Sequence, residues 1–354
     1  MIRPWERSLF KQCRRAWDLS ARERQDYEPT EPPHVFDFPE AIHDALDVYY
    51  FPGMWDWGRA IVRPLAVQAF VKSMRRQRGD YAARCELSSA QQQAWEEHVE
   101  LGTGMLERYF VWAAEVDRFS PLQVAVLFDV TIPEPGRPDV GLCTADGRGV
   151  WYRVRVNMVV SDEHELCWLV EHRITPSTWD DLDALLMDEQ SLTRSWAWEV
   201  GFFGRLEGTI HNELRMAVPG DGDPPPDVLD VQALPGPSGL IKQESNALFR
   251  RTQIPRRPAE LQRRGPAVAH EAMEMIDPGL RVYPNPSLEH CLGCAFREPC
   301  VAMNSGGDAR AILDTSYRKR TSEDFEQGRL GSVWGIGPAE ISRVREHPGP
   351  GNQR

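Results

Sequence analysis

The chain has 354 residues, of which 41% are hydrophobic and 27% are charged, so it is long enough to bury a large core. Its formal net charge of −12 argues against a protein that coats nucleic acid without specificity, although a local basic groove stays compatible with this charge. The sequence has neither a long apolar run nor a signal-like start, so we expect a cytoplasmic protein without membrane contact.

Apolar residues at helical spacing predict several helices before the first strand. These helices cover residues 5–26, 39–50, 56–77 and 88–116, with a proline-rich break at 28–33. From residue 123 the apolar period changes to two, which predicts strands at 123–132, 150–160, 166–173 and 208–216, and a helix at 186–204. Prolines, glycines and aspartates predict an exposed loop at 219–239, and residues 257–276 again have a helical pattern.

This order of elements predicts a mixed α/β domain over residues 1–320, followed by a flexible tail at 321–354. Within the tail, the run from Trp334 to Ile341 is similar to half of a helix–hairpin–helix, whose glycine-rich turn offers backbone N–H groups to a phosphate. The partner helix of such a motif is not evident in the sequence.

Three cysteines lie close together near the end of the chain, and a fourth lies near its start. Cys291, Cys294 and Cys300 have the spacing C-x2-C-x5-C, and Cys13 lies almost 280 residues upstream. The trio is bounded by prolines, which favours a ligand loop over a helix. Four thiolates suit an iron–sulfur cluster or a structural zinc ion, and either would join the two ends of the chain. Ordinary buried thiols are the alternative.

Arginines are concentrated in one stretch that has the composition of a nucleic-acid contact. Six of them fall within fifteen residues, at positions 250, 251, 256, 257, 263 and 264. Such a stretch can follow a phosphate backbone, and a solvated surface balanced by acids is an equally good interpretation.

The segment from Ser8 to Trp17, with Cys13 inside it, resembles the opening motif of the iron–sulfur PD-(D/E)XK nucleases. The run from Tyr283 to Pro286, followed by the cysteine trio, is similar to their C-terminal signature. This family includes the CRISPR-associated iron–sulfur exonucleases and other RecB-like proteins. The resemblance covers roughly residues 5–320 and implies a restriction-endonuclease-like mixed sheet flanked by helices, with a 4Fe-4S cluster on the four cysteines.

The resemblance also implies a nuclease pocket, in which a helical histidine and two strand acids bind Mg²⁺ or Mn²⁺. His43 matches the histidine, and Glu171 matches the second acid. Gln190 matches a supporting glutamine, and Arg194 stands where the family has a tyrosine. On this basis we expect His43 and Glu171 to form at most a weak metal site.

Two positions depart from the family pattern where the chemistry is most demanding. Asn157 stands in place of the first acid, and Arg173 replaces the lysine that follows the second acid by two residues. The Asn157 amide carries no charge, whereas Mg²⁺ prefers carboxylates as ligands. The Arg173 guanidinium is broad and planar, whereas the lysine ammonium is compact. Asp139 is an alternative first acid if the register differs.

These motifs are compatible with three interpretations. The first is a catalytically impaired pseudo-nuclease with an iron–sulfur cluster, which binds DNA or a protein partner in a DNA-processing or defence complex. The second is an active Mg²⁺- or Mn²⁺-dependent DNA exonuclease. The third is an interaction protein that is stabilised by zinc and makes no contact with DNA.

Overall fold

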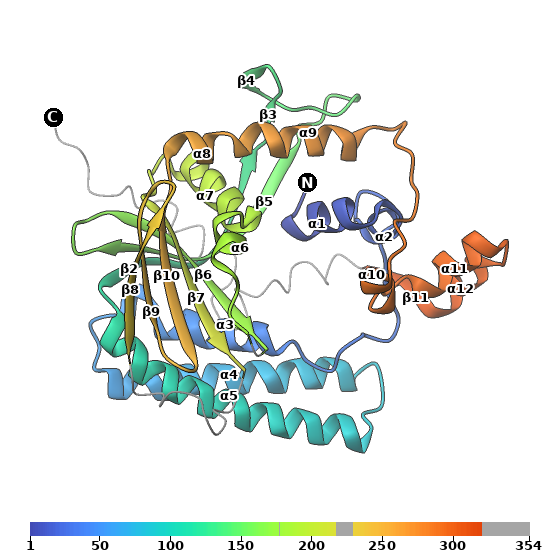
Figure 1. Ribbon diagram of the computed structural model, residues 1–354. Helices are drawn as coiled ribbons and strands as arrows, with labels where there is room; N and C mark the ends of the chain where they lie inside the picture. Colours follow the sequence, from blue (N-terminus) through green and yellow to red (C-terminus); the bar gives the residue numbers. More distant parts are fainter. Residues whose placement is uncertain (177, 217–228, 321–354) are drawn as a thin grey trace.

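A seven-stranded mixed sheet forms the centre of the molecule (Figure 1). The computed structural model describes residues 1–176, 178–216 and 229–320. The strands run in the order β2-β5-β6-β7-β10-β9-β8, and only β6 and β7 are parallel neighbours. Their bounds are β2 Phe119–Thr131, β5 Trp151–Asp162, β6 Cys167–Thr175, β7 Gly208–Arg215, β8 Asp230–Gly236, β9 Gly239–Ser245 and β10 Phe249–Pro255.

Helices cover both faces of this sheet, so its central strands are apolar on both sides. One layer consists of α3 (Phe38–Tyr49), α4 (Arg59–Ala82) and α5 (Ser89–Val116), with the short η1 (Pro52–Met54) before α4. The other layer consists of α7 (Glu189–Phe202) and α9 (Arg264–Ile276), with the short helices α6 (Leu182–Leu186) and α8 (Pro258–Gln262) near them. Val156 and Val160 of β5 are fully buried, as expected for a strand between two helical layers.

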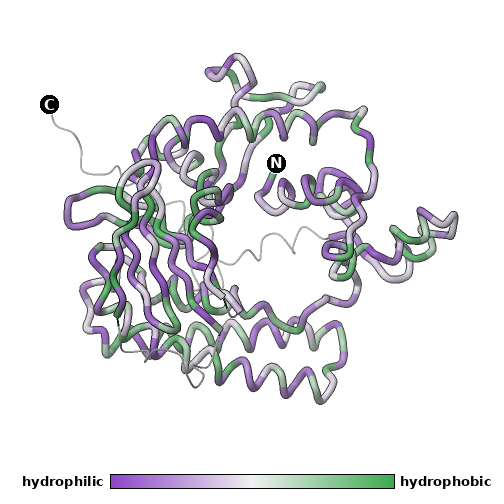
Figure 2. The backbone as a smooth tube through the Cα atoms, in the orientation of Figure 1, coloured by the Kyte–Doolittle hydropathy of each residue, from purple (hydrophilic) through white to green (hydrophobic). Residues whose placement is uncertain are grey.

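Side-chain caps explain where α3, α5 and α7 begin. Asp37 and Asp188 accept hydrogen bonds from backbone N–H groups in the first turns of α3 and α7. Ser88 forms a reciprocal capping box with Gln91 at the start of α5. In Figure 2 the projecting end of the α4–α5 hairpin is largely hydrophilic. Elsewhere the hairpin contributes buried residues such as Phe70, Met74 and Trp95 to the core, and α4 packs against α3.

The two ends of the described chain meet beside the sheet. The strand β1 (Tyr27–Pro29) pairs with β11 (Tyr317–Lys319), and α1 (Pro4–Gln12) and α2 (Arg14–Ser20) lie near the C-terminal helices (Figure 1). These helices are α10 (Leu288–Leu292), α11 (Arg297–Ser305) and α12 (Ala309–Ser316). Leu19, Phe296 and Leu313 share one small apolar cluster there, so burial holds the ends together.

The α/β class with a mixed sheet and flanking helices is confirmed, and three local predictions were wrong. The predicted helix 5–26 is interrupted at Cys13, which has extended backbone angles. The cysteine trio does not lie in a plain loop, because Cys291 belongs to α10 and Cys300 to α11. Part of the predicted loop 219–239 is strand β8, the edge of the sheet, which pairs with β9.

A small hairpin of β3 (Pro133–Glu134) and β4 (Arg137–Gly141) stands outside the central sheet. The predicted tail and its half helix–hairpin–helix lie outside the described residues. Among the described helices, none is both long and apolar enough to cross a membrane.

Candidate functional site

The candidate site lies where β5 and β6 separate from each other. The two strands pair from Ser161 and Cys167 up to Met158 and Val170, and beyond that point β5 stays with β2 while β6 continues beside β7. Asn157 and Glu171 are the next residues along the two strands, so both lie where the strands separate. We call this place the fork. The sheet therefore brings together the two positions at which the family resemblance places acids.

The strand opposite Asn157 is distorted. Ala125 has a φ of 53°, in the left-handed region that residues with a Cβ rarely adopt. Its neighbours Val124 and Val126 pair with Met158 and Val156, so Ala125 faces Asn157 across the ladder. Strain of this kind persists only where the surrounding structure holds it, and it is often found beside functional sites.

Glu171 is buried in the fork and already has a cationic partner. Its side chain is 4% exposed, and Oε2 accepts a hydrogen bond from the Arg194 guanidinium of α7. Burial raises the pKa of this carboxyl, and the charges of Arg194 and Arg173 offset the effect only in part. Oε1 is buried without a hydrogen-bond partner among the described residues. One carboxylate oxygen is therefore hydrogen-bonded, and the other has no partner among the described residues.

Arg173, two residues further along β6, points to other acids. Nη1 donates to Asp180 at 2.9 Å and Nη2 to Asp188 at 2.6 Å. Burial alone would raise the pKa of Asp188, but the charge and hydrogen bond of Arg173, together with His211 and the Ser191 backbone N–H, hold this pKa below its usual value. Arg173 therefore ties the strand to the start of α7 instead of standing beside a water molecule at Glu171.

His43 and Asn157 are both engaged with the backbone of one residue, His172. The Asn157 side-chain oxygen accepts the His172 backbone N–H at 3.3 Å. His43 of α3 places Nε2 3.2 Å from the His172 carbonyl oxygen. The histidine predicted from the sequence thus reaches the fork, but its ring contacts peptide oxygen.

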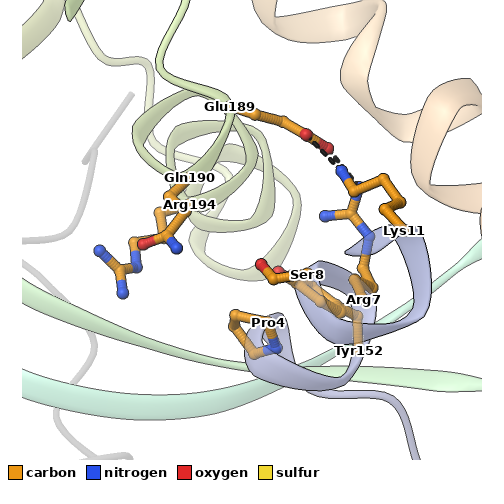
Figure 3. A pocket seen from close by; sticks show the side chains of 8 residues that line it. All are labelled: Pro4, Arg7, Ser8, Lys11, Tyr152, Glu189, Gln190 and Arg194. Carbon is orange, nitrogen blue, oxygen red and sulfur yellow. Dashed lines mark hydrogen bonds and ion pairs between the residues drawn. The ribbon is translucent and has the colours of Figure 1, made fainter. Parts of the chain in front are cut away.

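Gln190 lies on α7, one turn before Arg194, and faces a small pocket between α1 and α7 (Figure 3). Arg7 and Lys11 of α1 reach across this pocket to Glu189, and Arg7 donates to it at 2.7 Å. Both basic residues also pair with Glu271 of α9. Sequence reasoning missed these ion pairs because their partners are more than 170 residues apart along the chain.

Asp139, the alternative acid, does not reach the fork. It lies exposed on β4, in the hairpin outside the central sheet. The register of β5 and β6 places Asn157, and not Asp139, beside Glu171.

Three of the six arginines in the arginine-rich stretch have structural roles. Arg250 forms two hydrogen bonds to the buried Glu213, and Arg251 is buried against Asp117. Arg256 donates to backbone carbonyls of Leu185 and Leu186. These three guanidinium groups hold loops and strands in place, so the stretch as a whole does not present a continuous surface to a phosphate backbone.

The four predicted cysteine ligands lie in one neighbourhood. Burial raises the pKa of the Cys294 thiol, and the nearby sulfurs of Cys13, Cys291 and Cys300 raise it further. Cys13 and Cys294 pack against the same apolar cluster. The Asn285 backbone N–H donates to the Cys13 sulfur at 3.5 Å, and Arg15 donates to the Cys300 sulfur at 3.6 Å.

Among the described residues, neither the fork nor the group of four cysteines is a formed metal site. Across the described ranges, no group of three or more His, Cys, Asp or Glu side chains lies close enough together to hold an ion. At the cysteines the donor set still suits a thiolate-bound centre, because four thiols are neighbours and two of them receive N–H donors. At the fork the residues do not fit Mg²⁺ or Mn²⁺, since Glu171 is paired with Arg194 and Asn157 carries no charge.

Comparisons with known proteins add little to this picture. No protein-family model and no curated protein matches the chain. One solved structure, described as "Crystal structure of SSO0001", aligns with 64% of this chain and 78% of its own, at 12% sequence identity and a TM-score of 0.27. A likeness this weak carries no argument about function.

Proposed function

We propose that the protein is a PD-(D/E)XK-like scaffold of the RecB type that does not hydrolyse phosphodiesters and that binds DNA or a protein partner. The observation that carries this proposal is the state of the fork, where a guanidinium pairs with Glu171 and Asn157 replaces the other acid. Hydrolysis in such a pocket needs a divalent cation to generate hydroxide and to neutralise charge on the phosphate. Two carboxylates would be its natural ligands, and this fork has one.

Arg173 strengthens the argument against hydrolysis. A lysine at this position would present a compact ammonium to a water molecule, whereas the Arg173 guanidinium is already held by Asp180 and Asp188. Moving it toward Glu171 would leave those two acids without their counter-charge. The residue thus supports the architecture of the fork and does not act on a water molecule.

We propose further that Cys13, Cys291, Cys294 and Cys300 hold an iron–sulfur cluster of the 4Fe-4S type, with zinc as the alternative. Such a centre would supply a rigid link between α1–α2 and α10–α11, because its ligands come from both ends of the described chain. Iron and sulfide analysis of anaerobically purified protein distinguishes the two metals. Stoichiometric zinc without iron would reject the cluster.

A nuclease assay tests the first proposal. Anaerobically purified protein is incubated with single- and double-stranded DNA and Mn²⁺, and a filter-binding titration at rising salt is run on the same sample. We expect no cleavage in the nuclease assay. DNA binding that weakens as the salt concentration rises would identify DNA as the ligand of the protein. Cleavage that disappears in Glu171→Ala would overturn the proposal and identify an active exonuclease.

A further inference from the structure

The buried carboxylate of the fork has a cation of its own, supplied by the chain. Arg194 leaves α7 one turn after Gln190 and donates through Nη1 to Glu171 Oε2. In Figure 3 its guanidinium points away from the α1 side chains that line the other wall of the pocket. An arginine is charged at every physiological pH, so this positive charge is permanent.

We propose that Arg194 takes the place of a divalent cation in the fork and thereby blocks a cation site that Glu171 would otherwise form. The inference rests on the proposed function, because it names the residue that keeps the fork free of metal. It concerns the cation site itself and not the overall fold.

The burial of Glu171 and the engagement of Asn157 indicate that the guanidinium and a metal ion exclude each other here. The Glu171 side chain is 4% exposed, so a metal ion at this carboxylate and the Arg194 charge would face each other in a poorly solvated space. The Asn157 oxygen is occupied by the His172 N–H and offers no compensating ligand. Glu171 Oε1 and Arg194 Nε are both buried without hydrogen-bond partners among the described residues, so the pair uses only part of its hydrogen-bonding capacity.

Removal of Arg194 would take one positive charge away from Glu171. Glu171 would keep a buried carboxylate with a free second oxygen, and the nearby Asp188 charge already raises its pKa further. Arg173 is held by Asp180 and Asp188 and does not donate to Glu171 in the structure. A buried carboxylate without a partner attracts a cation, a proton or a hydrogen-bond donor.

The experiment measures Mn²⁺ binding by electron paramagnetic resonance on the full chain, together with the melting temperature with and without Mn²⁺. For wild type we expect only weak binding. In Arg194→Ala we expect affinity to rise on the order of a hundredfold, because a neighbouring unit charge is removed, and Mn²⁺ should raise the melting temperature. The double variant Arg194→Ala with Glu171→Gln should lose this binding.

Two further variants complete the design. Arg194→Lys keeps the charge and should bind Mn²⁺ as weakly as wild type, and it covers the case in which Arg194→Ala does not fold. Arg153→Ala removes an arginine that pairs with Asp129 at 2.8 Å elsewhere on β5, and it should not create a Mn²⁺ site.

The inference is overturned if folded Arg194→Ala binds Mn²⁺ no better than wild type, or if Arg194→Lys gains binding. It is overturned equally if Asn157→Asp alone, with Arg194 intact, gains a Mn²⁺ site. The proposed function fails on a different result, which is DNA cleavage by the wild-type protein. The two failures are therefore distinguishable.

Discussion

At the scale of single residues, the molecule places many of its charges where water cannot reach them. The side chains of Arg251 and Asp117 are 5% and 7% exposed and pair at 2.5 Å. Arg251 also donates to Tyr50, Tyr109 and Asn212, and Asn212 in turn contacts the ring of His172. A network of this kind is stable only when all of its members are present, because each one compensates the desolvation of another.

The pair of Asp117 and Arg251 gives a first stability prediction. Asp117→Asn leaves a buried guanidinium without its counter-charge, and we expect the free energy of unfolding to fall by about 3–5 kcal/mol. Urea unfolding followed by circular dichroism measures the change. The matched substitution Asp314→Asn breaks an exposed pair with Arg310 and should leave the free energy of unfolding nearly unchanged. Equal effects of the two substitutions would contradict the assigned role of burial.

His211 gives a prediction on pH dependence. It is fully buried in β7, and burial together with nearby arginine charges lowers its pKa to about 3. Its pKa in the unfolded chain is about 6.5, so the unfolded state binds the proton first as the pH falls. The stabilisation is complete above about pH 6.5 and is lost progressively toward pH 3.

Between pH 7 and pH 5.5 this one residue should lower the free energy of unfolding by about 1.2 kcal/mol. Unfolding of wild type and His211→Gln at both pH values isolates the contribution, because the other titrating groups are common to the two proteins. A variant with the same pH dependence as wild type would show that His211 does not titrate differently on unfolding.

At the same scale, the family resemblance singled out Asn157 and Glu171 but did not indicate the partner of Glu171. The structure places the two residues directly after the last paired residues of β5 and β6, Met158 and Val170. The pairing with Arg194 is set by how α7 packs across the sheet, which no local pattern encodes. The one signal in the sequence was Arg194 itself, which stands where the resembling family has a tyrosine.

At the scale of elements, most long periodic segments were predicted within about five residues, the interrupted helix at 5–26 excepted, whereas short or atypical ones were missed. The helix expected at 88–116 is α5 at Ser89–Val116, because its apolar spacing and its capping box agree. The strands β8, β9 and β10 escaped prediction, since proline, glycine and charged residues hide their alternation. The helices α10 and α11 are too short to show a periodic pattern.

The contact between α4 and α5 gives a prediction at this scale. A Cβ added at Gly102 would lie 2.2 Å from Phe70 Cζ, and Phe70 is fully buried and cannot move aside. Gly102→Ala should therefore lower the free energy of unfolding by about 1–3 kcal/mol, although alanine favours the helix. Gly104→Ala, on the same helix and facing open space, should instead stabilise by up to about 1 kcal/mol. The result would contradict the packing if both variants gained stability.

At the scale of the whole molecule, the ends of the described chain are joined by β1–β11 pairing and by a small apolar cluster, against which Cys13 and Cys294 pack. A shared centre on the four cysteines would bring the two ends together in the same way, and it stays a prediction. The sequence could not show that two of the trio belong to helices, nor that Arg15 and Asn285 donate to the sulfurs.

Loss of one cysteine should therefore loosen the whole domain. We expect Cys294→Ala to lower the iron content and to reduce the melting temperature by on the order of 5–10 °C, because the proposed centre ties both ends together. The control Cys143→Ala removes an exposed thiol of the polypeptide and should change neither quantity. Unchanged iron and melting temperature in Cys294→Ala would count against a centre at this site.

The central claim is that the fork is closed to metal by its own arginine, and anomalous X-ray diffraction from a crystal soaked in Mn²⁺ tests it most directly. We predict no anomalous peak within bonding distance of Glu171, with Arg194 still paired to its carboxylate. A Mn²⁺ ion bound to Glu171, with Arg194 displaced, would contradict the account.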